Sequence, residues 1–294
     1  MAASIIVRVL GGLGNQMFQY AAGTAMAQLH GARALLHLGD LNDRTSHGGY
    51  ALAKTFGLQA PEATNAELQA VLGLAYPLRR VMLHRKAGWL RSSRIVVEPH
   101  FAYWDGLRAV QPPYYLAGYW QAPRYFAGHE PAIRAAFSFA WEASPAVAEL
   151  ARRIGSCEAV SVHVRRGDYV TNPGMAKLHG VLPLDYYERA LRVVAERVER
   201  PTFFVFSDDT AWARANVRVA GETHFVGADA RTNAREDLRL MTLCRHHIIA
   251  NSTFSWWGAW LATHPQQVAC APLRWFAGDQ QDVSTLFPPG WVRV

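Results

Sequence analysis

The sequence predicts an α/β protein built from two Rossmann-like domains. Short apolar runs alternate with helical patterns, most regularly after residue 145. A glycine-rich loop follows the first apolar run, as in a strand–loop–helix unit. The 294 residues, 50% hydrophobic and 18% charged, are enough for two folded domains with their own cores.

The N-terminal half opens with a strand over Ile5–Leu10 and a helix over Met17–His30, in which apolar residues recur three or four apart. Ala34–Leu38 predicts a second strand. Residues 40–110 are irregular in pattern. The remaining elements predicted here are helical pieces near 64–73 and 76–87, a strand over Tyr114–Trp120, and a helix over Arg124–Phe137 interrupted near Gly128 and Pro131.

The second half alternates strands and helices, which implies parallel pairing in a doubly wound sheet. We place the boundary near residues 140–155, giving domains 1–150 and 151–294. The predicted strands are Ala159–Arg165, Thr202–Phe206, Thr223–Val226, His247–Ala250 and Gln267–Ala271. The predicted helices are Val147–Ile154, one beginning after Pro183, Thr210–Val217, Arg235–Cys244 and Ser255–Thr263.

Composition narrows the function classes. The net charge is +7, but the basic residues look scattered, which argues against nucleic acid and favours an anionic small molecule or an anionic membrane surface. No apolar run approaches the ~20 residues that span a bilayer, and the N-terminus lacks the features of a signal peptide. The three cysteines have no metal-like spacing, so we expect buried thiols and a cytoplasmic setting.

The end of the strand Ala159–Arg165 carries His163, Arg165, Arg166 and Asp168. Strand residues alternate faces, so His163 and Arg165 should point the same way, into the crevice at the carboxyl edge of the sheet. Two guanidinium groups there suit a phosphate or diphosphate. The alternative is that both arginines only pair with Asp168 and other local carboxylates.

Two loops before helices could bind anions through free N–H groups. The first is Gly11-Gly12-Leu13-Gly14-Asn15-Gln16, which matches neither a Walker A loop nor a full dinucleotide fingerprint. Asn15 and Gln16 add amide donors, although the loop could equally be a plain tight turn. The second lies within 250–261, where Ser252, Thr253 and Ser255 either cap a helix or line an anion site.

Carboxylates follow another strand and open a later helix. Asp208 and Asp209 could bind a divalent ion, but we favour hydrogen bonding to ribose or base hydroxyls, or helix capping. Glu236 and Asp237 begin a helix, where acidic residues stabilise the dipole. A carboxylate there could also accept the N–H groups of a guanine edge. The sequence predicts no metal site.

Four segments together resemble the bacterial α-1,2-fucosyltransferases of glycosyltransferase family 11. They occur in the family order and span nearly the whole chain. The His-x-Arg-Arg-x-Asp pattern is shared more widely with α-1,6- and protein O-fucosyltransferases, and the tryptophan-containing segment points to the α-1,2 group. The segments are residues 11–20, 163–169, 206–209 and 248–258.

The resemblance implies a GT-B-like enzyme whose two Rossmann-like domains face a central cleft. It implies inverting transfer of fucose from GDP-β-L-fucose, with no metal or other cofactor, to the 2-hydroxyl of a terminal β-galactoside. The C-terminal half would hold the donor and the N-terminal half much of the acceptor. The acceptor would be a bacterial surface glycan such as an O-antigen, and whether it is lipid-linked and brings the protein to the inner membrane surface is left open.

By the same resemblance, Arg165 clamps the β-phosphate with Arg166 beside it, and His163 lies near the guanine. Asp237 reads the guanine edge, and Asp208 also belongs to the donor site. The donor also contacts Asn15 and Gln16 from across the cleft, and Ser252, Thr253, Phe254 and Ser255.

The general base is left open between Asp168, His179 and Asp185, and a dissociated transition state needs little base assistance. His179 sits on a predicted loop near the phosphate strand, where it could equally be an ordinary exposed histidine. Two other functions also stay open: a non-catalytic nucleotide-sugar or glycan receptor, and a fucosyltransferase of another linkage such as α-1,6.

Overall fold

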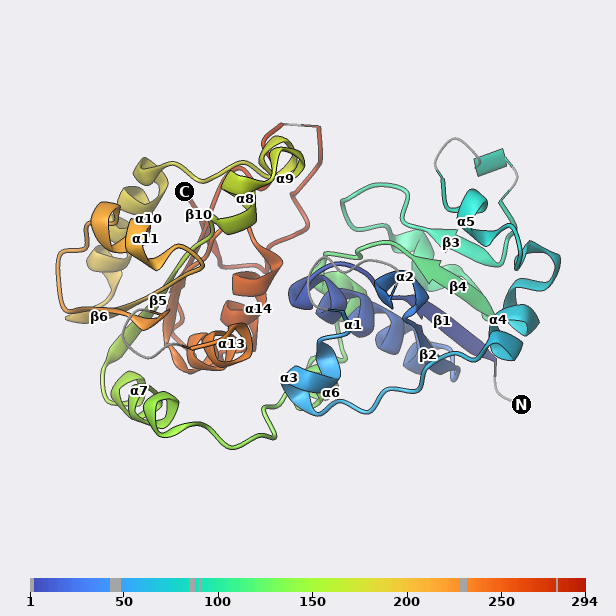
Figure 1. The fold of residues 1–294 in the computed structure, drawn as a ribbon, viewed down its shortest axis with the longest axis horizontal. Coiled ribbons are helices and arrows are strands. Elements are labelled where there is room, and N and C mark those ends of the chain that lie inside the picture. The colour runs from blue at the N-terminus through green and yellow to red at the C-terminus, as the bar shows by residue number, and fades with distance from the viewer. Residues whose placement is uncertain (1–2, 43–48, 85–87, 90, 228–231, 279) are drawn as a thin grey trace. The chain divides into compact units, whose positions relative to one another are not determined.

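The computed structural model describes residues 3–42, 49–84, 88–89, 91–227, 232–278 and 280–294. The chain forms two compact units (Figure 1), Met1–Ala140 with Asp282–Leu286 and Trp141–Gln281 with Phe287–Val294. The division falls at residues 140 and 141, at the start of the interval 140–155 in which we place the boundary, and residue 150 lies inside helix α7 (Pro145–Gly155). The expected cleft and the roles given to the two domains stay predictions.

The first unit contains a four-stranded parallel sheet in the order β2-β1-β4-β3. Strands β1 and β4 are adjacent although two strands separate them in sequence, so the carboxyl end of β1 is a point where the strand order reverses. The strands are β1 (Ser4–Arg8), β2 (Arg33–His37), β3 (Ile95–Val97) and β4 (Tyr114–Ala117).

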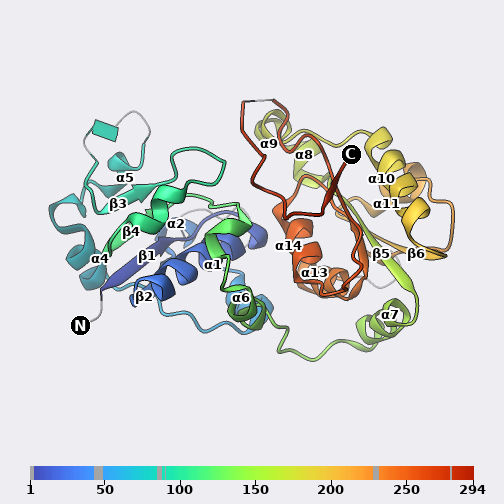
Figure 2. The same ribbon diagram turned by 180° about the vertical axis from the view of Figure 1, so that it is seen from behind.

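Helices cover both faces of this sheet (Figures 1 and 2). Helix α1 (Leu13–Leu29) packs on β1 and β2, and α4 (Asn65–Leu72) packs its apolar side chains against Ile6 and Tyr115. A Cβ added to Gly23 of α1 would lie 2.1 Å from Cγ2 of Val7, so glycine permits this close approach. The other helices are α2 (Gly39–Asn42), α3 (Leu52–Phe56), η1 (Gly73–Ala75), α5 (Arg79–Met82), η3 (Asp105–Ala109), η4 (Pro123–Phe126) and α6 (Glu130–Ala136).

The second unit contains a six-stranded parallel sheet in the order β10-β9-β8-β5-β6-β7. Read from β7, this is the third, second, first, fourth, fifth and sixth strand of the unit, the order of a dinucleotide-binding Rossmann sheet. The order reverses between β5 and β8. The strands are β5 (Glu158–Val164), β6 (Pro201–Ser207), β7 (Thr223–Phe225), β8 (His246–Ile248), β9 (Ala269–Ala271) and β10 (Val292–Arg293).

Both faces of the second sheet are buried, which explains why its central strands are apolar along their length. On one face Val160 and Val162 pack with α10 (Leu184–Arg197) and α11 (Thr210–Asn216). On the other face Phe204 and Phe206 pack with α7 and α13 (Ala234–Leu243). The buried helix α14 (Thr253–Leu261) packs against α13. The prediction of an α/β fold with two Rossmann-like domains is confirmed.

The irregular region 40–110 is where prediction and structure differ most. Strand β3 lies there unpredicted, because three residues are too few to show a period. The helix expected over 76–87 is reduced to the four residues of α5, and residues 85–87 lie outside the described part of the chain. Outside this region, the interruption predicted near Gly128 in the helix over Arg124–Phe137 is present: η4 and α6 are separate helices, and Gly128 between them has a φ of +84°.

Two expectations about composition can be compared with the structure. Cys244 and Cys270 are buried, whereas Cys157 is half-buried. Within the described residues, no helix is both long and apolar enough to cross a membrane.

Candidate functional site

The candidate site lies at the switch point of the second sheet, where β5 and β8 end side by side. Val162 of β5 pairs with Ile248 of β8, and each strand then runs into a polar loop. The loop after β5 leads into α8 (Gly167–Thr171), and the loop after β8 leads into α14. In open α/β sheets this edge is where ligands bind.

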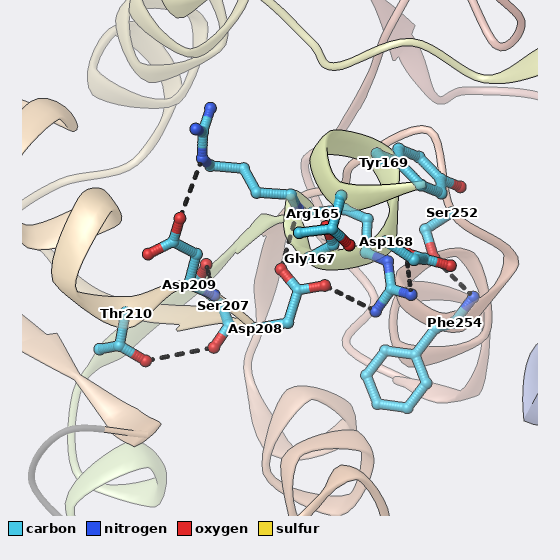
Figure 3. Close-up of polar contacts among 12 residues, drawn as sticks. Arg165, Gly167, Asp168, Tyr169, Ser207, Asp208, Asp209, Thr210, Ser252 and Phe254 are labelled. Carbon is cyan, nitrogen blue, oxygen red and sulfur yellow. Dashed lines mark hydrogen bonds and ion pairs between the residues drawn. The ribbon is translucent and has the colours of Figure 1, made fainter. Parts of the chain in front are cut away.

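Arg165 is held between two carboxylates (Figure 3). Its Nη2 lies 2.6 Å from Oδ1 of Asp168 and its Nη1 lies 2.8 Å from Oδ2 of Asp208. Its guanidinium also lies 5.5 Å from the ring centroid of Tyr169. The three charged side chains keep 30%, 27% and 26% of their surface exposed, so Arg165 is fixed in position yet reachable from solvent. A guanidinium has five N–H groups, so two contacts leave others for an anion.

Arg166 is fixed separately. Its Nε lies 3.3 Å from Oδ2 of Asp209, and its guanidinium lies 3.7 Å from the ring centroid of Trp212. Its backbone N–H donates to Oδ1 of Asp208 at 2.8 Å. Asp209 also caps α11 by accepting the N–H of Trp212 at 3.1 Å. The helix-capping alternative for this carboxylate pair therefore holds for Asp209.

The paired charges change the electrostatic expectation. Two arginines against three aspartates leave a formal charge of −1, so the alternative that both arginines pair with nearby carboxylates describes the contacts in this structure. A Cβ at Gly167 would lie 2.6 Å from Oδ2 of Asp208, so glycine is needed for this packing. The cluster can bind an anion by directed N–H groups and by exchange of a carboxylate, but not by net charge alone.

His163 lies near the end of β5, in the protein interior. Its side chain is 5% exposed, its ring centroid lies 5.7 Å from that of Phe254, and its Nδ1 has no hydrogen-bond partner among the described residues. Burial, with a further contribution from the charge of Arg165, lowers its pKa to about 3. His163 is therefore a neutral ring at physiological pH. Its expected contact with a guanine stays a prediction.

Tyr169, His179 and Asn251 form a frame that links the two loops. The rings of Tyr169 and His179 stack with centroids 4.9 Å apart and planes 4° apart. The Tyr169 hydroxyl donates to the carbonyl oxygen of Asn251 at 3.1 Å, and the Asn251 side chain donates to the carbonyl oxygen of His179 at 3.0 Å. This frame joins the segment after β5 to the segment after β8.

His179 is packed rather than an ordinary loop histidine. Its second ring face lies against Phe276, with centroids 5.5 Å apart. Burial lowers its pKa, the charge of Asp168 raises it, and the charge of Arg165 lowers it further. Its Nδ1 is buried without a hydrogen-bond partner among the described residues, so Nε2 is the nitrogen that could take a proton from a ligand.

The start of α14 is capped by its own side chains. Ser252 accepts the N–H of Phe254 at 3.4 Å. Buried Ser255 accepts the N–H of Ala250 at 3.2 Å and donates to the carbonyl oxygen of Ser252 at 3.3 Å. Thr253 begins the helix and, like Ser252 and Phe254, is partly exposed. The capping alternative is thus present, and the phosphate contact stays a prediction.

Asp237 lies in the first turn of α13. It accepts a hydrogen bond from the hydroxyl of Thr232. Burial raises its pKa to about 6, and the hydrogen bond from Thr232 opposes this shift. A carboxyl group of this kind can accept N–H groups when ionised. Its reading of a guanine edge stays a prediction.

Asn15 and Gln16 lie in the first unit, in the first turn of α1. Gln16 is fully buried and its amide is used by backbone groups of that unit: it donates to Gly11 and Gly49 and accepts from Ala51, each at 2.9 Å. Asn15 accepts from the side chain of Gln121 at 2.9 Å. Gln16 thus has a structural role in its own unit, and a donor contact by either residue stays a prediction.

Three residues of the site, Tyr169, Trp212 and Asn251, were not predicted from the sequence as site residues. A signal for two of them exists, because Tyr169 follows Arg165 by four residues and Asn251 directly precedes the serine of the α14 cap. Trp212 could not be found in this way, since its contact with Arg166 crosses from one strand end to another.

No group of three or more His, Cys, Asp or Glu side chains that could hold a metal ion occurs within the described ranges. Asp208 and Asp209 instead contact arginines and backbone N–H groups.

Known proteins resemble this chain along most of its length. Residues 105–294 match the family described as Glycosyl transferase family 11. The chain is 33% identical over 299 residues to an Alpha-1,2-colitosyltransferase of Escherichia coli, covering 99% of this chain and 98% of that protein. It is 30% identical to the O-antigen biosynthesis glycosyltransferase WbnK of Escherichia coli, covering 97% and 98%. It is 28% identical to the Galactoside alpha-(1,2)-fucosyltransferase 2 of Rattus norvegicus, covering 87% and 66%.

Proposed function

Since this chain belongs to glycosyl transferase family 11, we propose that it transfers L-fucose from GDP-β-L-fucose to the 2-hydroxyl of a terminal β-galactoside, with inversion at the anomeric carbon. The observation that carries the proposal is Arg165, held by two carboxylates at the switch point of a Rossmann sheet, next to the start of a buried helix. The α-1,2 linkage is supported by relatives whose names specify it. A surface glycan acceptor is supported by similarity to WbnK.

A second donor has its own support. The 33% identity to an Alpha-1,2-colitosyltransferase favours transfer of colitose, the 3-deoxy form of L-fucose, by the same site. The two donors differ by one hydroxyl group. A site that hydrogen-bonds that hydroxyl rejects the sugar lacking it much more strongly than a site that merely tolerates it.

The chemistry asks for stabilisation of the departing GDP. As the bond between the sugar and the phosphate breaks, negative charge develops on the diphosphate and positive charge on the sugar ring. Arg165 and the N–H groups at the start of α14 would stabilise the diphosphate charge, which is the role a divalent ion has in other transferases. A phosphate oxygen would replace Asp168 on Nη2 of Arg165. Asp208 would stay, because it also accepts the N–H of Arg166.

The base would be Nε2 of His179. The lowered pKa keeps this ring neutral near pH 7, and stacking on Tyr169 fixes its plane. Asp168 is the weaker candidate, because its Oδ1 already accepts a hydrogen bond from Nη2 of Arg165 at 2.6 Å. Asp168 is thus assigned as the residue that positions Arg165 until the donor binds.

The proposal is tested by incubating the purified chain with GDP-fucose or GDP-colitose and a panel of defined β-galactosides. We expect GDP release that depends on the acceptor, and a product whose NMR spectrum shows an α-1,2 linkage. GDP binding without release on any galactoside would identify a receptor, and another linkage would correct the acceptor position. Activity should survive excess EDTA; complete loss restored by Mg²⁺ would make Asp208 and Asp209 metal ligands.

A further inference from the structure

A surface of the first unit, far along the chain from the candidate site, exposes large apolar side chains. Leu74 is 97% exposed, Trp89 is 83% exposed, and Leu78 and Val81 are each 54% exposed. We call these four residues the apolar patch. Single exposed apolar residues are common on protein surfaces, but here four of the eleven exposed large hydrophobics found among the described residues fall within 16 positions of the sequence.

The four side chains belong to one short stretch of the first unit, and all of them are exposed to solvent. Local backbone hydrogen bonds connect η1 to α5. The N–H of Leu78 donates to the carbonyl oxygen of Ala75, and the N–H of Val81 donates to that of Leu78. Leu74, Leu78 and Val81 follow one another at intervals of four and three residues along this segment, and each faces solvent. The turn that carries Trp89 is tied back to the end of α5, because Nε of Arg91 donates to the carbonyl oxygen of Met82 at 3.0 Å.

The opposite side of the same segment is also apolar and already has its partner. Tyr76, Met82 and Leu83 pack against the core formed by α4 and the sheet. Figures 1 and 2 both show α5 beside β3, at the margin of the unit. A surface segment that is apolar on its inner side needs no second apolar side for folding. The outer side is therefore explained by a partner and not by the core.

Charge identifies the partner. Residues 71–94 hold six arginines and lysines and no aspartate or glutamate, compared with a net charge of +7 for the whole chain. The basic residues, which look scattered over the whole sequence, are thus concentrated in this segment. Arg79 and Arg80 lie between members of the patch. Arg80 keeps 64% of its side chain exposed, with Asp40 3.8 Å away.

We propose that the apolar patch and the arginines beside it dock this protein on the surface of an anionic phospholipid bilayer. Leu and Trp side chains enter the interface between headgroups and acyl chains, while neighbouring arginines attract the lipid phosphates. A bilayer satisfies both features together, since an apolar protein surface alone would not call for a basic surround. The inference does not depend on the donor or on the linkage formed. It concerns the place, a membrane surface, at which the protein binds its acceptor.

The test is co-sedimentation of the whole chain with vesicles of phosphatidylcholine alone or with added phosphatidylglycerol. We expect binding to the anionic vesicles only, weakened by salt. Leu74→Ser combined with Trp89→Ser should weaken it more than tenfold, and Arg80→Gln about fivefold, the effect of one charge near an anionic surface. Leu273→Ser, at a side chain 57% exposed in the other unit, and Arg200→Gln, at a side chain 90% exposed, are the matched controls.

Three results would overturn the proposal: no binding to anionic vesicles, equal losses in the patch and control variants, or self-association of the free chain through the patch in analytical ultracentrifugation. Transfer to a soluble acceptor is measured in parallel and should be unchanged in every variant. Loss of vesicle binding with transfer intact separates this inference from the proposed function. The reverse pattern, binding without transfer, would leave the docking surface in place and remove the proposed function.

Discussion

Each unit has one point at which its strand order reverses, and different kinds of side chains lie at these two points. In the first unit, between β1 and β4, buried amides hydrogen-bond to nearby backbone: Gln16 to Gly11, Gly49 and Ala51, and Gln19 to Leu10 and Gly118. In the second unit, between β5 and β8, charged side chains contact one another and stay partly exposed.

The difference separates a loop that completes the fold from a loop that can bind a ligand. A buried amide whose hydrogen bonds go to nearby backbone groups is not exposed to a ligand, and breaking those bonds costs stability. A guanidinium held by two partly exposed carboxylates can exchange one of them for a phosphate. The same strand–loop–helix pattern therefore has different meanings in the two units, and the following predictions test that distinction.

Arg165→Ala should have the largest effect. Removing the directed cation from the departing diphosphate should lower kcat by about 10²–10³-fold, the usual loss when one such donor is removed. The kcat of Arg165→Lys should lie between those of the wild type and Arg165→Ala, because the ammonium group keeps the positive charge but lacks the planar guanidinium that binds a phosphate through two N–H groups. Steady-state kinetics with thermal unfolding of each variant measures this. The control is Arg189→Ala, an exposed arginine paired with Asp185 on α10.

Near-normal kcat in Arg165→Ala would contradict the assignment of the donor site. A large drop in unfolding temperature would instead indicate that Asp168 and Asp208, left without their shared partner, disturb the loop. Their partial exposure to solvent argues against that result, because water can hydrate the two carboxylates.

The next largest effect should distinguish His179 from Asp168 as the general base. His179→Gln should lower kcat by about 10²-fold or more and remove the fall in kcat at acidic pH, if His179 is the base. Burial lowers its pKa, so this fall should lie below the ordinary histidine range, where the ring takes up a proton and stops accepting one. Asp168→Asn should change kcat less than tenfold and leave that fall in place. The pH dependence of kcat for both variants measures the difference.

The opposite ranking would make Asp168 the base and His179 part of the frame with Tyr169 and Asn251. His179→Phe is a useful third variant, because it keeps a ring for stacking on Tyr169 and Phe276 and removes both nitrogens. Equal losses in the Gln and Phe variants would indicate that the nitrogen matters, whereas rescue by Phe would indicate that the stacking matters.

Much of this fold could be predicted because its signals are local. The strand Ala159–Arg165 and the helix after Pro183 match β5 and α10 within a residue or two, since apolar spacing decides them. Strand β3 could not be predicted, because a strand of three residues is fixed by pairing with β4 rather than by its own pattern.

The sequence indicates which residues gather at the candidate site but not how they pair. The motif at 163–169 follows β5, at the point where the strand order of the second sheet reverses. Arg165 contacts Asp208 because β5 and β6 are adjacent in the sheet. That adjacency cannot be predicted from a single sequence. The alternative that the arginines pair with local carboxylates was therefore correct about the contacts. Both that alternative and ligand binding can hold for one arginine, because its donors outnumber those contacts.

Gln16→Ala should have the smallest effect on catalysis and a clear effect on the fold. The substitution leaves the N–H of Ala51 and the carbonyl oxygens of Gly11 and Gly49 without their partner, so unfolding should become easier by about 2–4 kcal/mol. Gln19→Ala is the matched control, because Gln19 lies on the same helix, is fully buried and makes two such bonds. Urea unfolding and kcat measured on both variants give the comparison.

If the loop after β1 completes the fold, both variants lose stability and keep kcat within about threefold under conditions where they stay folded. If that loop contacts the donor, Gln16→Ala alone loses kcat or raises the KM for GDP-fucose well beyond its change in stability. The second result would extend ligand binding to the first unit. The ends of β1 and β5 would then both bind the ligand, and they would differ only in whether charged or neutral side chains contact it.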